Sequence, residues 1–516
     1  MEIYILINEK AQGPYTRELV LQYLNSGQFK STDLAAYAGS ADWKPLSAMM
    51  QSWAGPGKGT RFSPGAAAPV ASSKRKSAAA IAAVVLVLVL GAAGFVLWKS
   101  HGTKTGTMID GDTSSEAGLP KSYAELNAWY VEPPEGQNAA TFFAKGFDAL
   151  QISQADQDSN DLPVLGKGSL PPPGTPLPSR MKASIAALVQ RNEAAWAALE
   201  QGADLEKARY PIDLSRGAET LLPHLTKIKR VAQFAQLKTA MCVDDKQPQG
   251  AADALLVSLA VGQSLKDEPI LISQLVRVAC CAIETANLQN VINSVALSPS
   301  DLERLSVSFS KAESEDSVGR NFSRALVAER VGCLALFDMP PDKRKAELKS
   351  FEGQNNMTGV SAENMMQNLK AQRAFAEETF NHALAMRQEP FPERSKVDDY
   401  FSTRATEAIN SGYYVAQIFL TGLGKGTRRE AAGLSNLRLA QTAIALERFR
   451  QSNGGSYPDS LAKLAPAFLP EVPLDPFDGN PLRYQINGEG YEMHSIGADP
   501  AKPISFKVTK VPKLAL

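Results

Sequence analysis

Cysteine and histidine are scarce in this chain, with four of each among 516 residues. A structural zinc site takes its ligands from these residue types and commonly places two cysteines at C-x-x-C spacing. That spacing is absent among the four cysteines, which are Cys242, Cys280, Cys281 and Cys333. The sequence therefore predicts no metal site, and it indicates no cofactor.

An excess of charge of either sign is also lacking, because Lys and Arg number 54 and Asp and Glu number 54. A protein that binds nucleic acid usually carries a strongly basic surface. We therefore predict no nucleic-acid partner. The hydrophobic content of 44% argues against a wholly disordered chain, and the length of 516 residues predicts several domains.

Catalytic motifs are missing as well, since neither H-E-x-x-H nor G-x-S-x-G occurs. The segment GLGKGT, Gly422 to Thr427, fits neither common phosphate-binding spacing, and we interpret it as a flexible connection. We predict that the chain is not an enzyme. The alternative is a site assembled from residues far apart in the sequence.

One long uncharged run is present, from Ser77 to Trp98. As a helix rising 1.5 Å per residue it would span about 33 Å, which matches a hydrocarbon core of about 30 Å. The run predicts a single transmembrane helix, and the alternative is a helix buried inside a soluble domain. Trp98 and Lys99 suit the membrane interface at its far end.

Basic residues flank this run unequally. Lys74, Arg75 and Lys76 precede it directly, whereas Lys99 and Lys104 follow it. By the positive-inside rule the N-terminus is cytoplasmic and the bulk of the chain is extracytoplasmic. The start, MEIYILINEK, lacks the basic and apolar regions of a cleavable signal. We therefore expect the run to act as both signal and anchor in the inner (plasma) membrane.

The N-terminal residues predict a small α+β unit. EIYILIN alternates like a strand, with Ile3, Ile5 and Ile7 on one face. A Gly-Pro turn follows, and an N-capped helix is expected from Thr16 to Gly27. A second short strand in DLAAY and a terminal helical turn complete the unit.

This pattern resembles the bacterial GYF-like domain, a short relative of the GYF peptide-binding fold. The likeness is carried by Tyr4, Ile5, Gly13, Pro14, Tyr15, Leu19, Leu24, Gly27, Gly39, Trp43, Pro45 and Leu46. The resemblance implies that a proline-rich or other peptide binds on an aromatic surface, which suits an already extended polyproline helix. The implied peptide-binding residues are Tyr4, Gly13, Pro14, Tyr15 and Trp43. The alternative is that Tyr15 and Trp43 belong to the core.

After the membrane run the composition becomes helical. Apolar stripes at helical spacing, such as that from Ile228 to Met241, predict a large α-helical domain of stacked hairpins. One hairpin is expected to include a helix capped by Asp267, with Pro269 in its first turn. Passages such as LEKARYPID are similar to those of an uncharacterised group of bacterial envelope proteins. The proline-rich stretch at residues 171–178 is interpreted as a stiff spacer.

The last region predicts a long helix from about Gly433, a dense turn at DPFDGNP and a β-hairpin around NGEG. It resembles the globular end of type II secretion pseudopilins. The matching residues are Tyr457, Pro458, Leu461, Pro473, Asp475, Pro476, Gly479, Pro481, Tyr484, Ser495, Gly497 and Asp499. The acidic calcium loop and the assembly helix of that family are absent from the sequence, so we interpret this region as a structural module without bound calcium.

Several polar residues have two interpretations. Cys242 could form a disulfide with Cys280 or Cys281, but the cysteines are better explained as small buried side chains. Adjacent Cys280 and Cys281 would point about 100° apart on a helix. We expect His224 to cap a helix or lie on the surface, and Asp244 and Asp245 to be solvated in a loop.

Together these patterns predict a multidomain, single-pass membrane adaptor. Its partners would be a peptide or protein in the cytoplasm, the membrane, and an unknown extracytoplasmic protein or cell-wall component. The alternatives are an envelope hydrolase with its site in the helical domain and an accessory protein of secretion or pilus assembly. The predicted parts are the GYF-like domain at 1–53, a linker at 54–76, the transmembrane helix at 77–98, a linker at 99–120, the helical domain at 121–430 and the pseudopilin-like unit at 431–516.

Overall fold

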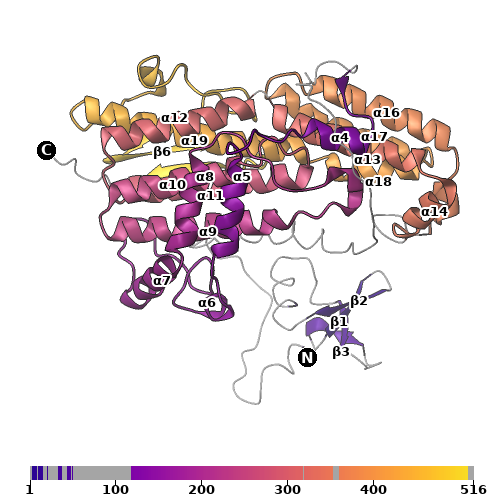
Figure 1. Ribbon diagram of the computed structural model, residues 1–516, viewed down its shortest axis with the longest axis horizontal. Helices are drawn as coiled ribbons and strands as arrows, with labels where there is room; N and C mark the ends of the chain where they lie inside the picture. Colours follow the sequence, from indigo (N-terminus) through magenta and orange to yellow (C-terminus); the bar gives the residue numbers. More distant parts are fainter. Residues whose placement is uncertain are drawn as a thin grey trace, which may run out of the picture. The chain divides into compact units, whose positions relative to one another are not determined.

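The computed structural model describes part of the chain, which separates into two compact units, Met1–Ile81 and Ala82–Leu516 (Figure 1). The predicted transmembrane helix, the linker before it and most of the linker after it lie outside the described residues. The described residues are 3–7, 10–15, 20, 33–37, 43–47, 49, 118–317, 319–352 and 359–509.

The N-terminal unit contains an antiparallel sheet with the strand order β2-β1-β3-β4. Ile3 and Ile5 are fully buried, which confirms the core face predicted for the first strand. The strands are β1 (Ile3–Ile7), β2 (Lys10–Tyr15), β3 (Leu34–Tyr37) and β4 (Lys44–Pro45).

The predicted Gly-Pro turn is wrong, because Gly13 and Pro14 lie within β2. This strand is at the edge of the sheet, and its pairing with β1 is irregular between Ile3 and Ile5. An edge strand at an irregularity tolerates proline because the missing N–H removes no ladder bond that the sheet needs. Gly13 and Pro14 therefore continue the edge strand and do not form a turn.

The second unit is mostly helical, as predicted (Figure 1). Its first helices are α4 (Tyr123–Trp129), α5 (Ala139–Ala149), α6 (Gln154–Asp158), α7 (Ser179–Arg191), α8 (Glu193–Ala203), η2 (Leu214–Glu219), α9 (Pro223–Asp244), α10 (Pro248–Gln263), α11 (Leu271–Ile292) and α12 (Pro299–Ser317). They continue with α13 (Arg320–Asp338), α14 (Pro341–Lys349), α15 (Ala362–Met365), α16 (Leu369–Met386), η3 (Glu393–Ser395), α17 (Lys396–Asn410), α18 (Tyr414–Leu423), α19 (Gly426–Ser452) and η4 (Leu461–Leu464).

Helices α9, α10 and α11 pack against one another in sequence and form the stacked layer visible across the centre of Figure 1. Short connections join them, so successive helices run antiparallel, and the predicted hairpin of α10 and α11 is confirmed. Its start differs from the prediction. α11 begins at Leu271 with the extended residue Ile270 at its N-cap position, so Asp267 does not cap it and Pro269 lies before its first turn.

Helix α11 lies between two hydrophobic clusters. Cys280 belongs to the cluster formed with α9, α13 and neighbouring helices, and Cys281 belongs to the cluster formed with α12 and α19. Their divergence follows from the turn of about 100° between successive helical residues. All four cysteines are buried, as the preferred interpretation expected. Within the described residues, α11 is also the one helix long and apolar enough to cross a membrane.

The C-terminal strands are β5 (Arg483–Asn487), β6 (Gly490–Ser495) and β7 (Ile504–Val508), which form an antiparallel sheet. The hairpin of β5 and β6 confirms the prediction around NGEG. Helix α19 starts at Gly426, earlier than expected, and packs on α11 and α12, while β7 packs on α19 and α11. The predicted boundary at 430/431 thus falls inside a core helix of one compact unit.

Candidate functional site

The predicted peptide-binding residues lie along the N-terminal sheet. Tyr4 is in β1, the Gly13–Tyr15 segment is in β2, and partly buried Trp43 immediately precedes β4. The register places Tyr15 opposite Ile3, so β1 and β2 bring the first four residues together. β2 and β4 are the two edges of the sheet. At a strand spacing of about 4.8 Å, roughly 14 Å separates these edges, so Trp43 does not adjoin the others through neighbouring strands.

The helical unit has an open groove of about 930 Å³ between α5, α8, α10 and α12. α8 and α12 each pack on α10, which forms the floor between them. We call this feature the α10 groove. No local sequence pattern predicts this groove, because it depends on the packing of helices far apart in the chain.

Apolar side chains form the floor of the α10 groove. Phe143 and Val257 are buried beneath it, and Leu256 is partly buried. Val307 on the exposed face of α12 is 59% exposed and adds an apolar side chain to the groove. The floor therefore offers apolar surface to a ligand.

Charged side chains surround this floor, and most of them have partners. Arg304 on α12 forms a 2.6 Å ion pair with Asp253 on α10, and Lys311 forms an ion pair with Glu206 beyond the end of α8. These pairs are partly or largely exposed, so solvent screens their attraction and they contribute little to stability. The rim is consequently easy to rearrange.

A second polar group is buried around Glu268, which is fully buried between α10 and α11. Its carboxylate lies 3.0 Å from Nε2 of His224 and accepts hydrogen bonds from the hydroxyls of Tyr130 and Ser273. The ring of Tyr210 stacks on His224 with centroids 4.2 Å apart. The prediction that His224 is a cap or surface residue is therefore wrong, because Glu268 and Tyr210 hold it in the core.

This group contains serine, histidine and glutamate but lacks the geometry of a nucleophilic triad. In such a triad the histidine lies between the acid and the nucleophile. Here Glu268 is in the middle, and it binds both His224 and Ser273. The hydroxyl of Ser273 therefore donates to the carboxylate of Glu268, and no histidine stands between them as the general base of a triad would.

The GLGKGT segment joins α18 to α19, and its end is occupied from within the protein. The backbone N–H groups of Thr427 and Arg428 donate to the buried carboxylate of Asp398 on α17, at 2.9 and 2.8 Å. These are the donors that would otherwise bind an anion at a helix N-terminus. Nearby, Glu430 forms a buried 2.8 Å ion pair with Arg387.

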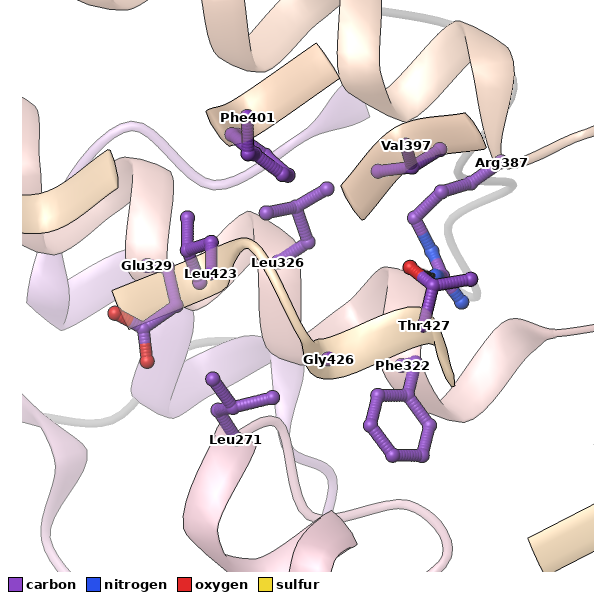
Figure 2. Close-up of a pocket in the computed structure, with 10 residues that line it drawn as sticks. All are labelled: Leu271, Phe322, Leu326, Glu329, Arg387, Val397, Phe401, Leu423, Gly426 and Thr427. Carbon is purple, nitrogen blue, oxygen red and sulfur yellow. Dashed lines mark hydrogen bonds between the residues drawn. The ribbon is translucent and has the colours of Figure 1, made fainter. Parts of the chain in front are cut away.

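A small pocket lies beside this junction, with room for about one water molecule (Figure 2). Leu271, Phe322, Leu326 and other apolar side chains line it, and Glu329 of α13 contributes a carboxylate. Burial among these side chains raises the pKa of Glu329 to about 7. Arg387 also borders the pocket, but its guanidinium binds Glu430.

Two further buried acids also have internal partners. Glu447 on α19 accepts hydrogen bonds from Arg450 and from the hydroxyl of Tyr457. Glu284 on α11 accepts a hydrogen bond from Ser258 on α10. Neither acid lines the α10 groove.

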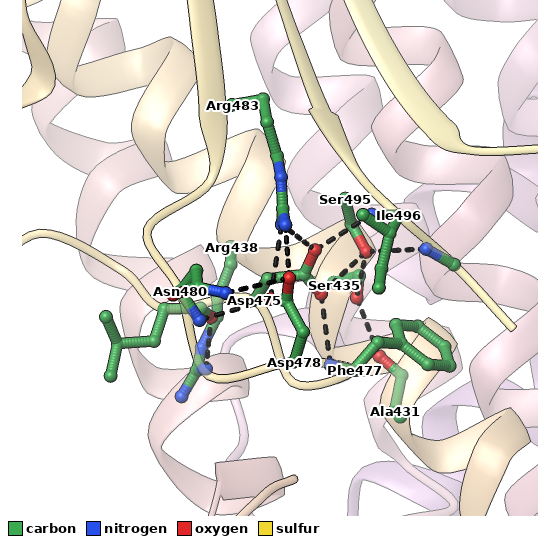
Figure 3. Close-up of polar contacts among 12 residues, drawn as sticks. Ala431, Ser435, Arg438, Asp475, Phe477, Asp478, Asn480, Arg483, Ser495 and Ile496 are labelled. Carbon is green, nitrogen blue, oxygen red and sulfur yellow. Dashed lines mark hydrogen bonds and ion pairs between the residues drawn. The ribbon is translucent and has the colours of Figure 1, made fainter. Parts of the chain in front are cut away.

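Asp475 is the centre of a group of polar contacts beside β5 and β6, as Figure 3 shows. This fully buried carboxylate accepts hydrogen bonds from the hydroxyl of Ser495, the backbone N–H of Ile496 and the guanidinium of Arg483. Arg483 also binds Asp478, and this lowers the pKa of Asp478 to about 2. The guanidinium of Arg483, at the start of β5, thus balances the negative charge of both aspartates in the DPFDGNP turn. Among the described residues no cluster suited to a metal ion is found.

The structure also contradicts the prediction that Asp244 is solvated in a loop. Asp244 is not in a solvated loop, because it ends α9 and accepts hydrogen bonds from the ammonium of Lys182 and the backbone N–H of Leu177. Its side chain is 12% exposed. Asp244 thus ties the chain before α7 to the end of α9.

Comparisons with protein families, with curated proteins and with solved structures find no match to this chain.

Proposed function

We propose that this chain is a single-pass adaptor or scaffold of the inner (plasma) membrane. Its N-terminal GYF-like unit binds a proline-rich or other peptide in the cytoplasm, and its helical unit binds a protein or cell-wall partner outside. The unequal basic flanks of residues 77–98 support this orientation.

The observation that carries the proposal is the contrast between the α10 groove and the buried acids. The groove is open, has an apolar floor and has exposed charges at its rim. The fully buried acids lie elsewhere and are held by internal donors. A binding surface needs the first feature, whereas an acid-base enzyme needs acids that converge on a substrate pocket.

The hydrolase alternative would use acids within the groove. Of those, Asp253 and Glu206 form ion pairs with α12, and Glu200 accepts a hydrogen bond from the indole of Trp196. Carboxylates held in this way at an exposed rim lack the desolvation that tunes a catalytic acid. The groove therefore favours binding over hydrolysis.

The membrane orientation is tested with accessibility tags in intact cells. One tag is placed before residue 70 and a second after residue 110 of the full chain. We expect only the second tag to react with a membrane-impermeant reagent applied from outside. Reaction of the early tag alone would invert the proposed sides.

Peptide binding is tested by titrating the full chain with arrayed proline-rich peptides. We expect Tyr15→Ala and Trp43→Ala to weaken binding, because flat rings are the docking surface for a polyproline helix. Ser47→Ala, at an exposed position of the same unit, is the matched control. Peptide binding that is equal in all three variants would remove these rings from the site.

A further inference from the structure

The size of the α10 groove matches a short piece of helix. Two turns of an α-helix form a cylinder roughly 10 Å wide and 11 Å long, with a volume of about 850 Å³. The groove has a volume of about 930 Å³. Because α8 and α12 both pack on α10, a third helix entering between them would meet the same ridges and grooves that already hold the layer.

The pattern of apolar residues also suits a helix. Leu256 and Ala260 are one turn apart on α10, and Val307 on α12 extends the apolar surface toward the opening. An amphipathic helix that binds in a groove buries an apolar stripe of this kind. The 59% exposure of Val307 would then be the exposure of an unoccupied contact.

Charge specifies the flanks of the bound helix. Five acidic and three basic residues line the groove. Arg304 and Lys311 are paired with Asp253 and Glu206, and Glu303 is paired with Arg448, which does not line the groove. The lining thus has two more acidic than basic residues. Asp204, at the exposed end of α8, adds a further negative charge. Complementary potentials steer association and select the partner, so the flanks of the helix should be basic.

We propose that the α10 groove binds an amphipathic α-helix of a partner protein, with an apolar stripe on α10 and Val307 and with Lys or Arg facing the acidic rim. The inference rests on the proposed adaptor function and specifies its extracytoplasmic partner. The exposed ion pairs at the rim rearrange at little cost as the helix enters.

The test uses the full chain in nanodiscs of zwitterionic lipid, with empty nanodiscs as the blank. Three photoreactive peptides are compared: one with a leucine stripe and lysine flanks, one with the same stripe and glutamate flanks, and a scrambled lysine peptide without a stripe. We expect only the first to label α8, α10 and α12, as located by mass spectrometry. Equal labelling by either of the others, or labelling away from the groove, overturns the proposal.

A pair of charge reversals sharpens this test. Asp204→Lys should reduce labelling by the lysine-flanked peptide about tenfold, whereas Asp161→Lys makes the same change at an exposed residue that does not line the groove. Equal loss in both variants would assign the effect to overall charge and overturn the proposal. Val307→Glu should also abolish labelling, and circular dichroism verifies the fold of each variant. Correctly placed membrane tags without groove labelling would reject only this inference, whereas inverted tags would reject the proposed function.

Discussion

Substitution of Glu329 tests whether a buried carboxyl makes the stability of the helical unit depend on pH. Glu329 lines the small pocket together with Leu271, Phe322 and Leu326, and burial raises the pKa of its carboxyl from 4.5 to about 7 (Figure 2). A rise of this size corresponds to about 3.4 kcal/mol between the two protonation states. Partial access to the pocket reduces this, so we expect about 2 to 3 kcal/mol.

The sign of the pH dependence follows from which state loses its proton first. Below pH 4.5 the carboxyl is protonated in both the folded and unfolded chains, so it causes no penalty. Between pH 4.5 and about 7 the unfolded chain ionises first, and the free energy of unfolding falls as the pH rises. Glu329→Gln cannot ionise, so its stability relative to the wild type should increase by about 2 to 3 kcal/mol across this interval.

The assay is urea unfolding of the full chain in a neutral detergent, followed by far-ultraviolet circular dichroism at several pH values. Glu193→Gln, at the exposed start of α8, is the matched control and should reproduce the wild-type pH profile. A difference between wild type and Glu329→Gln that is constant with pH would refute the reasoning, because a constant difference reports packing and not ionisation.

Four other substitutions test the polar and packed contacts. Asp475→Ala should lower the free energy of unfolding by about 3 kcal/mol, because Arg483 and the N–H of Ile496 lose their acceptor, and faster amide exchange at Ile496 would locate the effect. His224→Ala should cost about 3 kcal/mol by leaving Glu268 without its nearest nitrogen, and an unchanged denaturation midpoint would contradict this. Gly262→Ala would place a Cβ 2.8 Å from that of Cys280 and should cost about 1 to 3 kcal/mol in the same unfolding assay. At Gly422 in α18 an added Cβ would meet no atom within 4 Å beyond the helix's own backbone. Gly422→Ala should therefore leave the free energy of unfolding unchanged or raise it by up to about 1 kcal/mol.

Local periodicity predicted the elements whose packing is also local. The stripe from Ile228 to Met241 lies within α9, and Ile3 and Ile5 mark the buried face of β1. In both cases neighbouring residues alone determine which face is apolar, and burial of that face stabilises the element. The hairpin of β5 and β6 was predictable for the same reason, since its turn residues lie between its strands.

The candidate site could not be predicted in this way. Val307 is an ordinary apolar helix residue in the sequence, and its place in a groove depends on α8 and α12 both packing on α10. His224 follows a proline at a helix start, which suggests a surface position, yet its partner Glu268 comes from the loop after α10. Contacts between residues so far apart leave no local periodic signal in the sequence.

Helix α11 shows why composition alone does not assign a membrane span. By length and hydropathy it is comparable with a transmembrane segment, as the run at residues 77–98 is. However, α11 buries Arg277 and Glu284 and makes contacts with α9, α10, α13 and α19. A lipid-facing helix would leave such charged groups without partners from other helices at great cost. Here Ser258 of α10 donates a hydrogen bond to Glu284, and Arg277 donates one to Gln263 of α10. Residues 77–98 contain no charged group that would require a protein partner, and this is the reason that the sequence predicts a membrane span there.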